Sequence, residues 1–210
     1  MISELCHDAE SDADLRDLLA VVASREGAEP ENDALDQGMK FVCAYIEQVP
    51  YMMKVAWISA SNVGLESEMK QILEMVNSYW IEGEDVIPDE LGIIGLLDDA
   101  YCSLSSMQAV SDHYRLQTGK YLFPDDLTAA NKAMRRIIGE PYSGELDRIV
   151  LNALQEAGLI EAVKSFASEE KQLHFSGNSN IWNHGPAGNM DITELSGLGL
   201  LRPARQKPPG

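Results

Sequence analysis

Asp85-Val-Ile-Pro-Asp-Glu-Leu-Gly-Ile-Ile-Gly-Leu-Leu-Asp-Asp99 connects two stretches of helical periodicity and places four aspartates in an otherwise apolar segment. The aspartates are Asp85, Asp89, Asp98 and Asp99. A carboxylate among Val, Ile and Leu is costly to dehydrate unless it is hydrogen-bonded, paired with a charge or bound to a cation. Each of these side chains therefore needs a partner, and the partners define what the connection does.

A structural role explains the four aspartates as helix caps. Asp89 follows Pro88 and precedes an acid, which is typical of a helix start, and Asp85 can accept turn amides at the end of the preceding helix. Asp98 and Asp99 lie about 100° apart on one helix, so we expect one to point inward and the other to face water.

Two glycines complete this structural interpretation. Gly92 and Gly95 allow a tight bend or a close approach of helices. The connection is then a locked hairpin between a helix that ends at Ile81 and one that begins at Leu96.

A divalent-metal site is the alternative. Mg²⁺ and Ca²⁺ prefer oxygen ligands, and Asp85, Asp89, Asp98 and Asp99 would supply them, for ion binding or for a metal-dependent enzyme. The spacing matches no EF-hand loop, and the segment contains no histidine.

The segment from Tyr79 to Ala100 resembles the signature of the YkvA-like domain family, over roughly residues 38–115. That signature has a tyrosine-led helix end, then Asp-x-Ile-Pro-Asp, an apolar stretch with glycine, and Asp-Asp at the start of the next helix. The matching residues here are Tyr79, Asp85, Ile87, Pro88, Asp89, Gly95, Asp98 and Asp99.

The resemblance implies a small helical domain of uncharacterised function. Many members carry the motif in a hydrophobic hairpin that looks membrane-associated. This chain differs because Glu82, Glu84 and Glu90 add charge to the hairpin. We therefore expect a water-soluble variant without membrane insertion.

Helical periodicity accounts for most of the remaining chain, and alternating strand patterns are almost absent. We predict an all-α bundle of six to eight helices, in which Pro50 stops or kinks one helix and the helix from Leu96 is the longest. The expected helices are Asp12–Arg25 capped by Ser11, Ala34–Pro50, Tyr51–Val63, Glu66–Ile81, Leu96–Gln117, one from Pro124, one capped by Ser143, and Leu159–Ala167.

Composition divides the chain into an N-terminal helix and loop (1–33), a helical domain with the hairpin at about 65–117 (34–168), and a Gly/Pro/Asn-rich tail (169–210). The tail is too poor in apolar residues to order itself alone, so we expect it to be flexible or docked on the bundle. Its isolated apolar residues are candidate anchors for a partner: Phe175, Trp182, Leu195, Leu198 and Leu201.

Charge narrows the classes of partner. With 16 basic and 34 acidic residues the formal charge is −18, which repels nucleic-acid phosphates and anionic lipid and attracts basic protein. The compact basic group Lys132, Arg135 and Arg136 is expected to be a solvated face paired with neighbouring acids.

Cysteine usage and the N-terminal residues favour the cytoplasm. Cys6, Cys43 and Cys102 are odd in number and widely spaced, which is typical of a reducing compartment. The first residues are acidic where a signal peptide needs a basic start, and no window is apolar enough for a membrane helix.

No standard hydrolytic or nucleotide-binding motif occurs, and the four histidines are scattered. We assign no catalytic residue and no cofactor. The leading hypothesis is a non-enzymatic, acidic helical protein that binds or regulates another protein. An inhibitor or immunity protein against a basic toxin is a special case of it.

Overall fold

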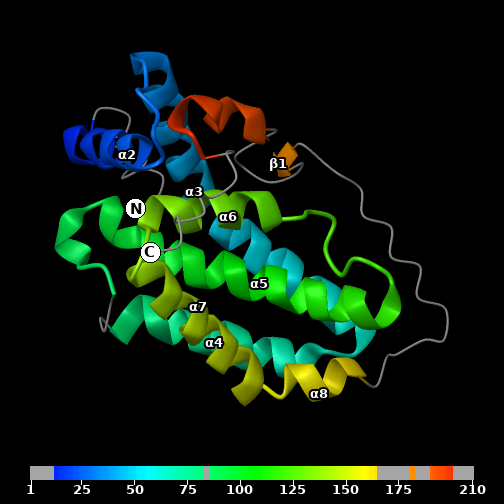
Figure 1. Cartoon of the computed structure of the whole chain (residues 1–210). Coiled ribbons are helices and arrows are strands. Elements are labelled where there is room, and N and C mark those ends of the chain that lie inside the picture. The colour runs from blue at the N-terminus through cyan, green and yellow to red at the C-terminus, as the bar shows by residue number, and fades with distance from the viewer. Residues whose placement is uncertain (1–11, 83–85, 165–179, 183–189, 201–210) are drawn as a thin grey trace, which may run out of the picture.

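The computed structural model describes residues 12–82, 86–164, 180–182 and 190–200, and it confirms the all-α fold (Figure 1). Its described part contains seven α-helices, three short 3-10 helices and one short antiparallel strand pair. In chain order these are α2 (Ala13–Arg25), α3 (Asn32–Val63), α4 (Glu66–Glu82), η1 (Asp89–Leu91), η2 (Ile94–Leu96), α5 (Leu97–Thr118), α6 (Thr128–Ile138), α7 (Tyr142–Glu156), α8 (Leu159–Lys164), β1 (Asn180–Trp182), β2 (Met190–Asp191) and η3 (Ile192–Leu198).

Helix α5 lies at the centre of the bundle, in contact with α3, α4, α6, α7 and α8 (Figure 1). Its apolar residues Leu104 and Met107 are fully buried, and so are the small residues Ala100 and Ser103. Small side chains on several faces let neighbouring helices approach closely. Helix α5 therefore has no water-facing side near its start, so both Asp98 and Asp99 are buried.

Helix α3 is the longest helix, at 32 residues, and it runs through Pro50 without ending. The prediction of two helices divided at Pro50 was wrong, as was the prediction that the helix from Leu96 is the longest. An internal proline costs a helix about 3 kcal/mol because it lacks an N–H and crowds the preceding turn. Burial on both sides of it opposes that cost, since Tyr45, Met52 and Ala56 are all fully buried.

Helix α2 shares its core with the rest of the bundle. Its cap is Asp12, whose carboxylate accepts the N–H groups of Asp14 at 2.9 Å and Leu15 at 3.0 Å. Ser11, the predicted cap, lies outside the described residues. Leu15 and Leu19 are fully buried and belong to the same apolar cluster as the helices after residue 34.

The described part of the tail is docked on the bundle. Helix η3 packs against α2 and α3, and Leu195 and Leu198 are fully buried. A Cβ at Gly38 of α3 would lie 2.6 Å from Leu198 Cδ1, so a larger residue there would force the Leu198 side chain to shift. A capping box at Asp191 starts the segment, and its residue Glu194 accepts the Asp191 N–H at 3.4 Å.

This docking corrects the prediction for two of the tail anchors. Leu195 and Leu198 are not presented to a partner, because apolar surface of their own chain already covers them. Phe175 and Leu201 lie outside the described residues, and only the backbone of Trp182 is described.

Within the described residues, no helix combines the length and hydropathy needed to cross a membrane.

Replacing Leu198 with alanine tests the docking of the tail. We expect the free energy of unfolding to fall by about 2–5 kcal/mol, because a buried leucine is lost and a cavity remains. Leu151, 47% exposed on α7, is the matched control, and its alanine variant should change stability by less than about 0.5 kcal/mol. Urea denaturation measures both, and equal effects at the two positions would contradict the docking.

Candidate functional site

Asp98, at the start of α5, forms hydrogen bonds with the end of α4 and with the connection between the two helices. Its side chain is fully buried at the start of α5. One carboxylate oxygen, Oδ2, accepts the Ile87 N–H at 2.9 Å and the Tyr79 hydroxyl at 3.3 Å, and Oδ1 accepts the Asp99 N–H at 3.1 Å. The Val86 N–H donates to the Tyr79 hydroxyl at 3.4 Å. Asp98 therefore ties the end of α4 and the connection to α5.

Burial sets the ionisation of this pair. It raises the pKa of the Asp98 carboxyl above its ordinary value, while the N–H groups of Ile87 and Asp99 partly oppose that rise. Burial, and then the nearby Asp98 carboxylate, raises the pKa of the Tyr79 hydroxyl, which keeps it protonated as a donor.

Asp99 is also buried, with 3% of its surface exposed. The prediction that one of the two aspartates faces water was wrong, because α5 is enclosed by other helices at this level. The Asp99 carbonyl accepts the Ser103 hydroxyl at 2.7 Å, and the indole Nε1 of Trp80 donates to Ser103 at 2.9 Å. This chain of hydrogen bonds is a second link between α4 and α5.

The glycines and the proline shape the turns of the connection. Gly92 has a φ of +63°, which favours glycine, and its carbonyl accepts the Gly95 N–H at 3.1 Å as η2 begins. The Pro88 carbonyl accepts the Leu91 N–H at 3.1 Å. Helix η1 begins at Asp89, so a helical turn starts where the Pro-Asp pair predicted one.

The described side chains do not test the four-aspartate metal site. Asp85 lies outside the described residues, and only the backbone of Asp89 is described. Among the side chains that are described, no three acidic, histidine or cysteine residues come together as metal ligands would. Both oxygens of Asp98 already accept hydrogen bonds from the protein, which is the role expected of a helix-locking residue.

A polar network between α5, α6 and α7 was missed by the sequence analysis. The Tyr101 hydroxyl donates to Asp147 at 2.6 Å, and Arg135 donates to Asp147 and to Glu140, each at 2.8 Å. Burial and the Asp147 carboxylate raise the pKa of Tyr101. Arg135 was expected to pair with neighbouring acids, and Glu140, in the turn before α7, is such a neighbour. Its other partner, Asp147, lies on α7, and no sequence spacing identified that pair.

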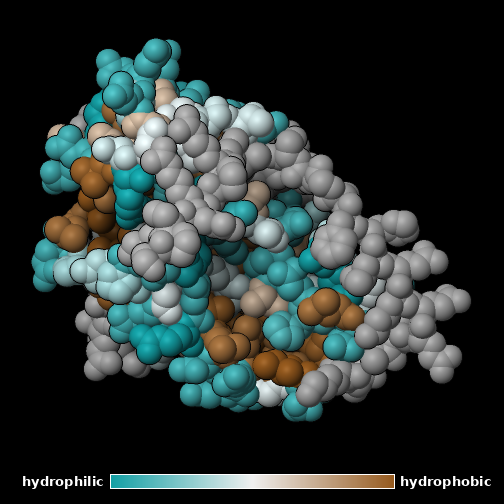
Figure 2. All heavy atoms as spheres, viewed as in Figure 1, coloured by the Kyte–Doolittle hydropathy of each residue, from teal (hydrophilic) through white to brown (hydrophobic). Residues whose placement is uncertain are grey.

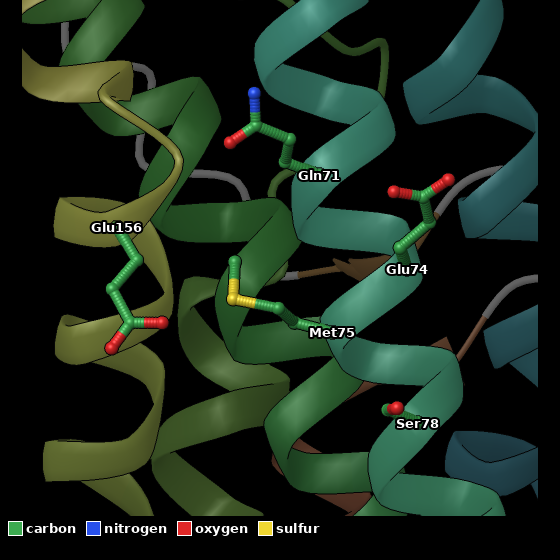
Figure 3. Close-up of a pocket in the computed structure, with 5 residues that line it drawn as sticks. All are labelled: Gln71, Glu74, Met75, Ser78 and Glu156. Atoms are coloured by element: carbon green, nitrogen blue, oxygen red, sulfur yellow. The ribbon is translucent and has the colours of Figure 1, made fainter.

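A groove of about 420 Å³ lies between α4 and the end of α7, lined by Gln71, Glu74, Met75, Ser78 and Glu156 (Figure 3). In this view Met75 points from α4 toward α7, and Glu156 faces it from α7. Glu74 points away from α7, along the outer side of α4.

The groove combines negative charge with one apolar side chain, that of Met75. Its lining contains two carboxylates and no basic residue. The Lys70 Nζ atom lies 3.7 Å from Glu74 Oε1, but both side chains are well exposed. Such surface ion pairs contribute little to stability, so Lys70 does not neutralise the groove. On the face seen in Figure 2 most described residues are hydrophilic, and apolar residues gather in two places, at the left side and at the lower edge over α7 and α8. The groove therefore suits a cationic ligand that also carries apolar groups.

The described cysteines and histidine have structural surroundings. Cys43 and Cys102 are buried and lie in no disulfide among the described residues, and burial together with Asp98 raises the pKa of the Cys102 thiol, which keeps it protonated and unreactive. His113 places Nδ1 2.8 Å from the Ala109 carbonyl on the same helix.

Comparison of the chain with protein-family models, curated proteins and solved structures gave no match. The groove and the Asp98 tie must therefore be interpreted from their own chemistry.

Replacing Asp98 with alanine tests the tie. We expect a loss of about 1–3 kcal/mol of stability, because the Ile87 N–H and the Tyr79 hydroxyl lose their acceptor inside the protein. The matched control is Asp17→Ala on the exposed side of α2, which should have little effect. Chemical denaturation of both variants gives the comparison, and an Asp98 variant as stable as the control would rule out the tie.

The raised pKa of Asp98 predicts a pH dependence with a definite sign. The folded state holds this proton more tightly than the unfolded state, so its contribution to stability falls as pH rises from the ordinary value of 3.8 to the raised native value. The stability of the wild type relative to Asp98→Asn should decrease across that window and level off above it. Urea denaturation between about pH 3.5 and 7 measures this difference. A relative stability that increases with pH would contradict the prediction.

Proposed function

We propose that this chain is a non-enzymatic protein-interaction domain that binds a basic partner segment in the groove between α4 and α7. The observation that carries the proposal is the groove lining, in which Met75 points from α4 toward α7, Glu156 faces it from α7, and Glu74 adds a second carboxylate on the outer side of α4. A helix with lysine or arginine on one side and an apolar residue beside them would complement it.

The charge of the chain supports this choice of partner. A formal charge of −18 raises the encounter rate with a basic protein and lowers it with nucleic acid or anionic membranes. A basic residue that reaches Glu74 or Glu156 gains local attraction in addition to this long-range effect. The affinity should therefore decrease as salt is added.

The Met75 side chain in the groove supports an interaction with a partner protein. Met75 is half-buried, and methionine adapts its shape to different apolar groups. Regulation of the partner, as an inhibitor or immunity protein does, is one use of such a surface.

The likeness to the YkvA-like family is part of this proposal for residues 38–115. What supports it is the contact between Tyr79 and Asp98, which joins the two ends of the motif. The cytoplasm is the compartment we propose, from the cysteine usage and the acidic charge.

A charge-reversal pair tests the groove. The full chain, as wild type and as Glu74→Lys with Glu156→Lys, is used to recover partners from the native host at low salt. We expect a basic protein that binds the wild type and loses at least about tenfold in affinity to the double variant, because two favourable charges become repulsive. Calorimetry with the purified partner measures the affinity.

The control changes net charge by the same amount elsewhere. Asp17 on α2 and Glu29 in the following loop are exposed and lie outside the groove lining. Asp17→Lys with Glu29→Lys should retain binding close to that of the wild type. Equal losses in both double variants would show a net-charge effect only, and recovery of no specific partner would count against the proposal.

A further inference from the structure

A second pocket, of about 360 Å³, has the opposite character from the groove. It lies where α2 and α6 end and α7 begins. The lining contains three guanidinium groups and two carboxylates, so it is net positive in a chain of strongly negative charge. Its residues are Arg25, Glu26, Arg135, Arg136, Gly139, Glu140 and Ser143.

Two of the three arginines keep an uncompensated charge. Arg135 pairs with Glu140 and Asp147. The Arg25 guanidinium donates to the Arg136 carbonyl, and the Arg136 guanidinium donates to the Leu200 carbonyl. Within the described part of the chain, neither Arg25 nor Arg136 forms an ion pair with a carboxylate. Backbone carbonyls orient both groups without neutralising them.

Ser143 supplies a hydroxyl that the fold does not use. The sequence predicted Ser143 as the cap of its helix, but α7 begins one residue earlier, after Pro141. The serine is fully buried, and its hydroxyl has no hydrogen-bond partner among the described residues. A buried polar group without a partner is costly. It lies in the first turn of a 15-residue helix, where the helix dipole favours an anion.

Gly139 keeps the Arg25 guanidinium in this position. It has a φ of +76°, and a Cβ there would collide with the Arg25 Nη1 atom. A side chain at residue 139 would therefore displace the arginine. The glycine, the Arg25 and Arg136 guanidinium groups and Ser143 in the first turn of α7 all line this one pocket.

We propose that this pocket binds a phosphate group, as free phosphate or as a phosphomonoester. A tetrahedral oxyanion can accept hydrogen bonds from guanidinium groups and from a hydroxyl together, and arginine suits such multidentate contact. Glu26 and Glu140 reduce the local positive potential, so the site selects an anion that makes several directed contacts over a weakly bonding one such as chloride. This site is separate from the groove, and it does not depend on the proposed function.

Phosphate binding by the full chain tests the inference. Inorganic phosphate and phenyl phosphate are titrated by calorimetry and by thermal unfolding, against sodium chloride at matched ionic strength. We expect saturable binding with a Kd of about 1 mM or tighter, and a matching rise in Tm. Tighter binding of phenyl phosphate would identify a phosphomonoester, and equal or weaker binding would identify free phosphate.

Two variants and a control locate the site. Arg25→Met and Ser143→Ala should each weaken phosphate binding, by about tenfold for the arginine. Ser143→Ala should leave Tm in chloride unchanged or higher, because its hydroxyl makes no hydrogen bond with the described residues. Arg148→Met removes an exposed arginine of α7 outside the pocket and should bind as the wild type does. No saturation below about 20 mM phosphate, or the same loss in Arg148→Met as in Arg25→Met, would overturn the proposal.

Discussion

The burial of the start of α5 on all sides is the constraint on which the other features depend. Because neighbouring helices enclose it, both aspartates at its start are removed from water, and their charge must be met by the protein. Asp98 meets this need with N–H groups from the connection and the hydroxyl of Tyr79. A buried carboxylate is stable only where these donors reach it, so the Asp98 hydrogen bonds favour one position of α4 relative to α5. An apolar residue at position 98 would also pack in the core, but it would accept no hydrogen bond and so would not hold Ile87 of the connection in one place.

The surface separates two kinds of charge. Acidic residues line the groove between α4 and α7, while arginines converge where α2 and α6 end and α7 begins. Cations near helix C-termini are stabilised by the helix dipole, which explains why Arg25, Arg135 and Arg136 occur where they do. Of these three arginines, Arg135 alone forms ion pairs with acids among the described residues, so a local positive site persists in a strongly acidic protein. The negative net charge can therefore attract a basic partner while the arginine pocket binds an anion.

Errors of the sequence analysis have identifiable physical causes. Pro50 was read as a boundary because its local cost is high, yet burial on both sides of it in α3 overrides that cost. Ser143 has the chemistry of a cap, but the helix begins before it and the hydroxyl is left inside a pocket. Leu195 and Leu198 stood out as isolated apolar residues in a polar tail. Their partners are on α2 and α3, more than 100 residues earlier in the chain, and no local pattern reveals such a contact.

By itself the sequence determined the helical class, most helix positions, the position of the turn at Pro88 and the sign of the charge. These depend on periodicity, on local backbone chemistry and on composition, all of which act within a few residues or as a sum over the chain. Only the tertiary structure decided that both Asp98 and Asp99 are buried, that η3 belongs to the core, and which acids neutralise Arg135. Only the tertiary structure assembles the residues that line the groove and those that line the arginine pocket, because each set comes from helices that are distant in sequence. Contacts between distant segments depend on how whole helices pack, and this is not encoded in the spacing of any one segment.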